Sequence, residues 1–237
     1  ENIIEAFKDL KAKTNEDSSV FLYYSGHGGT FTDNDILELE HPGKPLKSEE
    51  TNETHYYLQP NNFDVKRYKQ TWLEASDLRA CINALTTRRL ILFLDCCHAE
   101  GMTKGGVQTK ASEIQDSTED PQGLMQKIDD GKGMSIISSC RADELSWIQE
   151  DAINSLFTTC LLEVLKGENK DSFDEPFIRM TDVINYLMKK VPEREPLQRP
   201  FVNLQMYDDF ILGKLPKSKL DQVRENLDEI PLANKGV

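Results

Sequence analysis

Two uninterrupted apolar runs, at residues 20–24 and 90–94, dominate the hydrophobic pattern of the chain. Short runs of this kind, without polar alternation, are typical of strands buried on both faces of a parallel sheet. The first run leads into Ser-Gly-His-Gly-Gly at 25–29, and the second into Asp-Cys-Cys-His at 95–98. Because open α/β sheets carry their active sites at the carboxyl ends of parallel strands, we expect these polar residues to meet at one edge of the sheet.

The rest of the pattern alternates between helical and extended segments. It predicts helices over 2–13, around 78–85, over 154–166 and from Thr181 onward, and short strands over 56–58, 134–139, 177–178 and 201–206. An α/β domain rarely begins on a helix that feeds an inner strand, so we expect an N-terminal strand–helix–strand unit to be missing from this chain.

Two polar segments interrupt these elements. Residues 30–54 are rich in acids, Pro and Gly, and we expect an exposed excursion, such as a loose hairpin. His41 and His55 within or beside it are expected on the solvated surface. Residues 101–133 have the composition of a mobile loop, and a segment of this length inside a compact domain is usually either a functional loop or disordered.

Composition narrows the classes of function. The chain has 237 residues, of which 38% are hydrophobic and 29% charged, which suits a soluble α/β domain. We find no apolar run long enough for a membrane span and no signal-peptide core, and therefore expect no membrane partner. The net charge of −13 argues against direct nucleic-acid binding and would attract basic substrates, although it also serves solubility alone.

The five cysteines are odd in number, and the adjacent pair Cys96 and Cys97 would make a poor structural disulfide. We therefore expect reduced thiols and a cytoplasmic location. A metal site built from this pair and His98 is one alternative. Adjacent ligands chelate one tetrahedral zinc poorly and the chain has no Cys-x-x-Cys pair, so we expect no metal there.

The two motifs, taken in this order, resemble those of the caspase-like cysteine proteases (peptidase family C14), within them the metacaspases and their bacterial relatives. The motifs are Tyr-Ser-Gly-His-Gly at 24–28 and Leu-Asp-Cys-Cys-His at 94–98, followed by Ser-Cys-Arg-Ala-Asp at 139–143. The resemblance covers about residues 1–213. It implies an α/β caspase-like fold, with a mostly parallel central sheet flanked by helices in an α/β/α sandwich.

The resemblance also implies a division of the chain. Residues 1–213 would form the protease domain, with a large-subunit-like part at 1–100, a mobile, cleavable loop at 101–133 and a small-subunit-like part at 134–213. Residues 214–237 would be a linker or the start of a further segment. Because bacterial relatives often carry sensor or repeat modules, a regulatory domain or partner protein is expected to gate the activity.

By resemblance, Cys97 is the nucleophile and His27 the imidazole that raises its thiolate fraction and protonates the leaving amine. The backbone N–H groups of Gly28 and Cys97 would form the oxyanion hole. His98 is expected to be structural. On an extended strand Asp95 and Cys97 point to the same side, whereas Cys96 points the other way, toward packing.

Substrate preference follows from charge. In metacaspase-like relatives the acid two residues before the nucleophile, here Asp95, lines the primary pocket together with an acid matching Asp143. Two carboxylates in one pocket favour a basic side chain, so the expected substrates are proteins or peptides with Arg or Lys before the cleaved bond. Trp147 would wall a neighbouring subsite or lie half-buried in the core.

Two regulatory expectations remain open. A protease with basic specificity could cut itself in the 101–133 loop, at one of its four lysines, Lys104, Lys110, Lys127 and Lys132. Some relatives need calcium, and the acids at 113–120 and 129–130 could bind it, although they lack the spacing of an EF-hand loop. No other cofactor is expected. The main alternative to a protease is a catalytically silent caspase-like domain that serves as an interaction scaffold.

Overall fold

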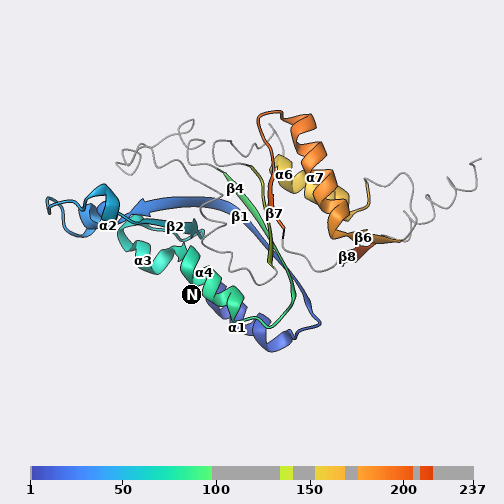
Figure 1. Cartoon of the computed structure of the whole chain (residues 1–237), viewed down its shortest axis with the longest axis horizontal. Coiled ribbons are helices and arrows are strands. Elements are labelled where there is room, and N and C mark those ends of the chain that lie inside the picture. Colours follow the sequence, from blue (N-terminus) through green and yellow to red (C-terminus); the bar gives the residue numbers. More distant parts are fainter. Residues whose placement is uncertain (1, 98–133, 141–152, 169–175, 205–208, 216–237) are drawn as a thin grey trace, which may run out of the picture. The chain divides into compact units, whose positions relative to one another are not determined.

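The computed structural model describes residues 2–97, 134–140, 153–168, 176–204 and 209–215, and these divide between two compact units. The first unit spans residues 1–147 and 197–206, and the second spans 148–196 and 207–237. Each is described by itself (Figure 1).

The first unit is built on a six-stranded sheet in the order β3-β2-β1-β4-β5-β7. Its strands are β1 (Ser19–Thr32), β2 (Thr54–Gln59), β3 (Leu73–Glu74), β4 (Arg89–Cys97), β5 (Met134–Ser138) and β7 (Phe201–Asn203). Its helices are α1 (Asn2–Lys13), α2 (Asp33–Glu40), α3 (Tyr68–Thr71) and α4 (Ala75–Asn83), with single 3₁₀ turns η1 (Glu49–Thr51) and η2 (Val65–Arg67).

The predicted α/β sheet is present, and its directions are mixed. The three central strands β1, β4 and β5 run parallel, as the apolar runs predicted. The outer pairings β1–β2, β2–β3 and β5–β7 are antiparallel.

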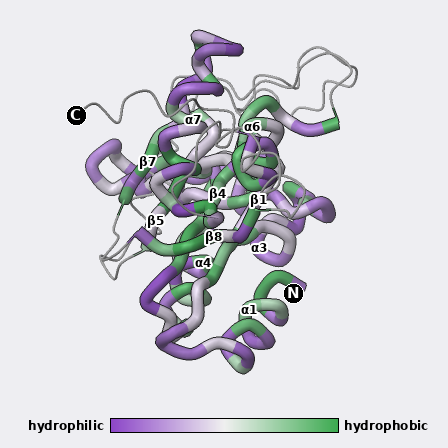
Figure 2. The backbone as a smooth tube through the Cα atoms, turned by 90° about the vertical axis from the view of Figure 1, so that its right-hand side faces the viewer, coloured by the Kyte–Doolittle hydropathy of each residue, from purple (hydrophilic) through white to green (hydrophobic). Residues whose placement is uncertain are grey.

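One face of this sheet packs on α1 and α4, which lie side by side beneath it (Figure 1). Alternate residues of β4 enter this core, among them Leu90, Leu92 and Leu94, each at most 5% exposed. Ile91 and Phe93 on the opposite face of β4 are fully buried as well. The strand is therefore apolar on both faces, as Figure 2 shows by its hydropathy colour along most of β4.

A second, aromatic core forms where β1 continues beyond the central strands. Phe31 of β1 stacks on Tyr57 of β2 with ring centroids 5.0 Å apart, and Tyr68 and Trp72 close around them. Residues 30–32 therefore belong to a strand and not to an exposed excursion: Phe31 is only 4% exposed. The excursion itself contains α2, which begins at a capping box between Thr32 and Asp35.

The second unit contains α6 (Leu156–Leu165), α7 (Met180–Arg194) and a two-stranded antiparallel sheet of β6 (Phe177–Arg179) and β8 (Ile211–Lys214). Ser155 caps α6 by accepting a hydrogen bond from the Thr158 N–H. The two helices are joined by a polar cluster in which Arg194 donates to Glu163 at 2.9 Å and Tyr186 donates to the same carboxylate at 2.9 Å.

Within the described ranges, no helix is both long and apolar enough to cross a membrane.

Candidate active site

His27 and Cys97, the two residues on which the sequence motifs converge, are direct register partners on adjacent parallel strands. The pairing of β1 with β4 runs from Ser19 opposite Arg89 to His27 opposite Cys97. Neighbouring strands lie about 4.8 Å apart, so the two backbones are adjacent. The structure thus brings together the two positions to which the sequence assigned the imidazole and the nucleophile.

The two strands behave differently at this point. Cys97 is the last described residue of β4, whereas β1 does not end at the histidine. It continues to Thr32, and its partner changes: residues up to His27 pair with β4, and residues from His27 onward pair with β2. The glycines around His27 would weaken an isolated strand, and pairing with β2 supplies the hydrogen bonds that carry β1 onward.

Tyr23, Asp95 and His27 share one face of this part of the sheet. The Tyr23 hydroxyl lies 3.5 Å from Asp95 Oδ2, which joins β1 to β4 four residues before His27. Asp95 is only 1% exposed, whereas His27 is exposed. A buried carboxylate therefore lies two residues before Cys97, where the sequence placed the acid of the substrate pocket.

Cys96 occupies the opposite face. It packs, partly buried, against the core beneath the sheet, together with the side chains from α1 and α4. Its backbone carbonyl accepts a hydrogen bond from the Ser139 hydroxyl at 3.3 Å. The prediction that Cys96 is a packing residue is confirmed.

A buried polar network holds the end of β4 to the segment after β5. The Ser139 N–H donates to the Leu94 carbonyl at 2.9 Å, and the Gln198 amide donates to the Ser139 carbonyl at 3.0 Å. Ser139 and Gln198 are both fully buried. Buried polar groups of this kind are costly unless paired, so the network holds the backbone of β4 beside Asp95 in place.

Gly28, the predicted oxyanion residue, is a buried position of β1 opposite Leu58 of β2. A Cβ atom at Gly28 would lie 3.4 Å from the Tyr57 carbonyl oxygen, at about van der Waals contact with the backbone of β2.

The remaining predicted site residues lie outside the described residues. These are Asp143, Trp147, His98 and the four lysines Lys104, Lys110, Lys127 and Lys132, together with the Cys97 side chain. Among the residues that the structure does describe, no group of three His, Cys, Asp or Glu side chains is placed to hold a metal ion.

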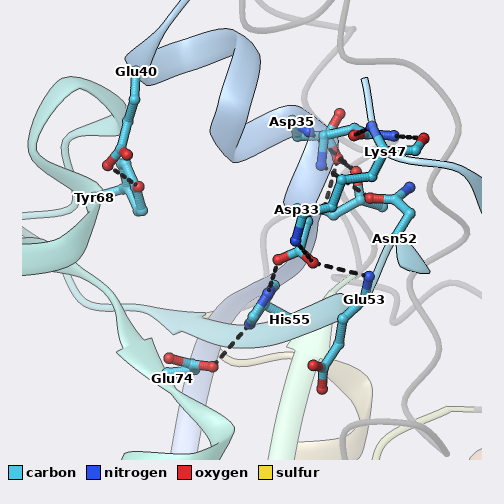
Figure 3. Close-up of polar contacts among 11 residues, drawn as sticks. Asp33, Asp35, Glu40, Lys47, Asn52, Glu53, His55, Tyr68 and Glu74 are labelled. Carbon is cyan, nitrogen blue, oxygen red and sulfur yellow. Dashed lines mark hydrogen bonds and ion pairs between the residues drawn. The ribbon is translucent and has the colours of Figure 1, made fainter. Parts of the chain in front are cut away.

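His55 is a residue that the sequence interpretation placed on the solvated surface and that the structure places in an ionic cluster (Figure 3). Its Nε2 lies 2.8 Å from Asp33 Oδ1 and its Nδ1 lies 3.1 Å from Glu74 Oε1. Asp33 also accepts a bond from Lys47 Nζ at 2.7 Å. The side chain of His55 is 23% exposed, and the prediction of a solvated histidine is wrong, whereas His41 is exposed as expected.

The electrostatics of this cluster favour a charged imidazole. Burial lowers the pKa of His55, but its hydrogen bonds to Asp33 and Glu74 outweigh that effect and raise the pKa above its usual value. Hydrogen bonds from Lys47 and His55 hold the pKa of the Asp33 carboxyl well below its usual range. The cluster links α2, β2 and β3, and it lies at the start of β2. Gln59, the register partner of His27, is at the other end of that strand. The cluster is therefore a structural tie and not part of the site.

Comparisons with known proteins agree with this geometry. The crystal structure of protein GSU0716 from Geobacter sulfurreducens matches with a TM-score of 0.52 and 19% identity, over 88% of this chain and 74% of that one. At this identity the match shows a shared fold. Among curated proteins, no sequence matches this chain.

The family comparison covers nearly the whole chain. The model of the caspase domain, peptidase family C14, matches residues 1–211, a range that includes β1, β4 and both motifs. The α/β fold expected from the motifs is confirmed by these matches. The chain belongs to the caspase-domain family of cysteine peptidases.

Proposed function

We propose that the chain is a cysteine endopeptidase that cleaves after Arg or Lys through a His27–Cys97 dyad. The observation that carries the proposal is the register pairing of His27 with Cys97 across parallel strands, which juxtaposes a histidine and a cysteine at the end of β4. Membership of the caspase-domain family supports a cysteine peptidase as the kind of function.

The proposed reaction uses groups of this chain and water. The Cys97 thiolate attacks the substrate carbonyl carbon, and the resulting oxyanion is stabilised by backbone N–H groups at Gly28 and Cys97. His27, protonated by the thiol, returns that proton to the leaving amine as the C–N bond breaks. Water, deprotonated by His27, then hydrolyses the thioester and regenerates the thiol.

Asp95 supports the basic specificity. It is a buried acid at the end of the strand that delivers Cys97, and alternation along an extended strand puts positions 95 and 97 on one face. A carboxylate shielded from water interacts strongly with a guanidinium or ammonium group and disfavours an acidic side chain. By resemblance, Asp143 would supply a second carboxylate and Trp147 a wall of a neighbouring subsite.

One assay tests both parts of the proposal. Fluorogenic peptides that differ only in Arg, Lys or Asp before the cleaved bond are compared on the wild-type chain, Cys97→Ala and His27→Ala. We expect turnover of the Arg and Lys peptides that both substitutions abolish. Turnover that survives Cys97→Ala would contradict the mechanism, preference for Asp would contradict the pocket, and no turnover by the wild type would favour the scaffold alternative.

Activation is part of the proposal. Cleavage by a second copy or by the chain itself after a lysine within 101–133 would yield two fragments in the wild type and none in Cys97→Ala. Intact-mass analysis distinguishes these outcomes. Because calcium activates some relatives, the same assay is run with EDTA and with added calcium chloride, and equal rates would exclude a calcium requirement.

A further inference from the structure

The Tyr24 hydroxyl joins the backbone of His27 to that of the residue opposite it on β2. It lies 2.7 Å from the carbonyl oxygen of His27 and 2.8 Å from that of Gln59. Carbonyls only accept, so the single hydroxyl proton is shared between them. His27 and Gln59 are register partners on β1 and β2, and the hydroxyl therefore clips these strands together at His27.

This clip lies where the described pairing of β1 passes from β4 to β2. Cys97 of β4 and Gln59 of β2 are both opposite His27. Among the described residues, β1 before His27 pairs with β4, and β1 after His27 pairs with β2. A strand that exchanges partners at one residue can hinge there, unless another contact fixes its backbone.

Gly26 allows the tyrosine to reach this position. A Cβ atom at Gly26 would lie 2.8 Å from the Tyr24 oxygen and 3.0 Å from its Cζ. The ring therefore extends along its own strand over residue 26, on the face that packs against the helices beneath the sheet. His27 is on the opposite face, so Tyr24 contacts its backbone and not its imidazole.

The Tyr24 hydroxyl is suited to holding the two carbonyl groups by hydrogen bonds and not to proton transfer. Burial, followed by the nearby Cys96 thiol, raises the pKa of Tyr24 well above its usual range. The group stays a neutral donor throughout the pH range in which a cysteine peptidase works.

We propose that Tyr24 is a positioning residue, which fixes the His27 backbone through the shared hydrogen bond and so sets the distance from the imidazole to the Cys97 sulfur. This inference rests on the proposed dyad. Because small displacements of reacting groups are costly, the loss of the hydroxyl should weaken the ion pair between imidazolium and thiolate.

The test is Tyr24→Phe in the whole chain, measured by peptide turnover and by iodoacetamide alkylation of Cys97 followed by mass spectrometry across pH 5–9. We expect kcat to fall by about tenfold or more with little change in KM. The acid limb of the kcat/KM profile and the midpoint of alkylation should both move to higher pH, since a less well placed imidazolium lowers the thiol pKa less.

Tyr68→Phe is the matched control. Tyr68 is buried, whereas Tyr24 is partly buried, and the Tyr68 hydroxyl donates to Glu40 at 2.6 Å, away from the dyad. Tyr68→Phe should lower the thermal midpoint, as we also expect of Tyr24→Phe, without moving either pH profile. Equal shifts in both variants would show a general effect of lost stability and overturn the proposal.

Gly26→Ala gives a second route, because its Cβ displaces the Tyr24 hydroxyl without removing it. It should reproduce the pH shift of Tyr24→Phe and add little to it in the double variant. Unshifted profiles in Tyr24→Phe overturn the role of Tyr24. If the wild type cleaves no peptide, the proposed function fails. The alkylation profiles still decide whether Tyr24 changes the pH at which the Cys97 thiol becomes reactive.

Discussion

His27 and Cys97 are register partners across β1 and β4, at the residue where the described pairing of β1 passes from β4 to β2. The histidine therefore lies within a strand and not at its end. Its backbone has support from β2 as well as from β4.

The two adjacent thiols should differ sharply in function. We expect Cys96→Ala to retain peptide turnover within about twofold, because its side chain packs in the core beneath the sheet, and to cost about 1 kcal/mol of stability. Cys97→Ala should show the reverse, with no turnover and little loss of stability. Turnover assays and urea unfolding of both variants check this, and an inactive but fully stable Cys96→Ala would reassign the nucleophile.

Asp95→Asn should lower kcat/KM for Arg and Lys peptides by about 10- to 100-fold. A hydrogen bond to a charged group contributes about 1.5–3 kcal/mol, and the substitution removes the charge while keeping the shape. Peptides with a neutral side chain before the cleaved bond serve as the control and should be cleaved as before. A uniform loss over all peptides would mean that Asp95 supports the fold and does not select the substrate.

The ionic cluster around His55 should make stability depend on pH. Both ring nitrogens face carboxylates, so the charged imidazole is bound in the folded state and its folded pKa is raised. Its contribution is complete below the unfolded pKa of about 6.5 and is lost as pH rises through the folded pKa. Asp33, whose pKa is lowered, stays ionised across this window.

Thermal midpoints of His55→Gln and the wild type should therefore differ most at pH 5.5 and converge toward pH 8.5. His41→Gln is the control, since His41 is exposed at the end of α2 and should leave the pH dependence unchanged. A difference that grows with pH would contradict the charged state assigned to His55.

Gln198→Met should destabilise the first unit by about 1–3 kcal/mol. The substitution keeps most of the side-chain volume and removes the donor to the Ser139 carbonyl, which leaves a buried acceptor unpaired. Gln70→Met in the exposed part of α3 should change stability by less than about 0.5 kcal/mol. Urea unfolding measures the free energy of unfolding of both variants. If Gln198→Met unfolds with the same free energy as the wild type, the network does not stabilise β4.

Much of the central sheet could be predicted from local pattern. The apolar run before Asp95 needs burial on both faces, and only a central strand provides such burial. Beyond that run, the alternation of side chains along the strand puts Cys96 on the opposite face from Asp95. The capping-box residues Thr32 and Asp35 mark the start of α2 in the sequence, but the interpretation of 30–54 as a polar excursion overlooked them.

The sequence by itself determined which residues are candidates for the chemistry and which strand carries the cysteine, because motifs and apolar runs are local. Only the tertiary structure decided that β1 continues through the glycines to Thr32, that Tyr24 reaches Gln59, and that His55 lies between two acids. Each of these depends on β2 pairing beside β1 at one particular register. A register is set by contacts between segments distant in sequence, and no local pattern records it.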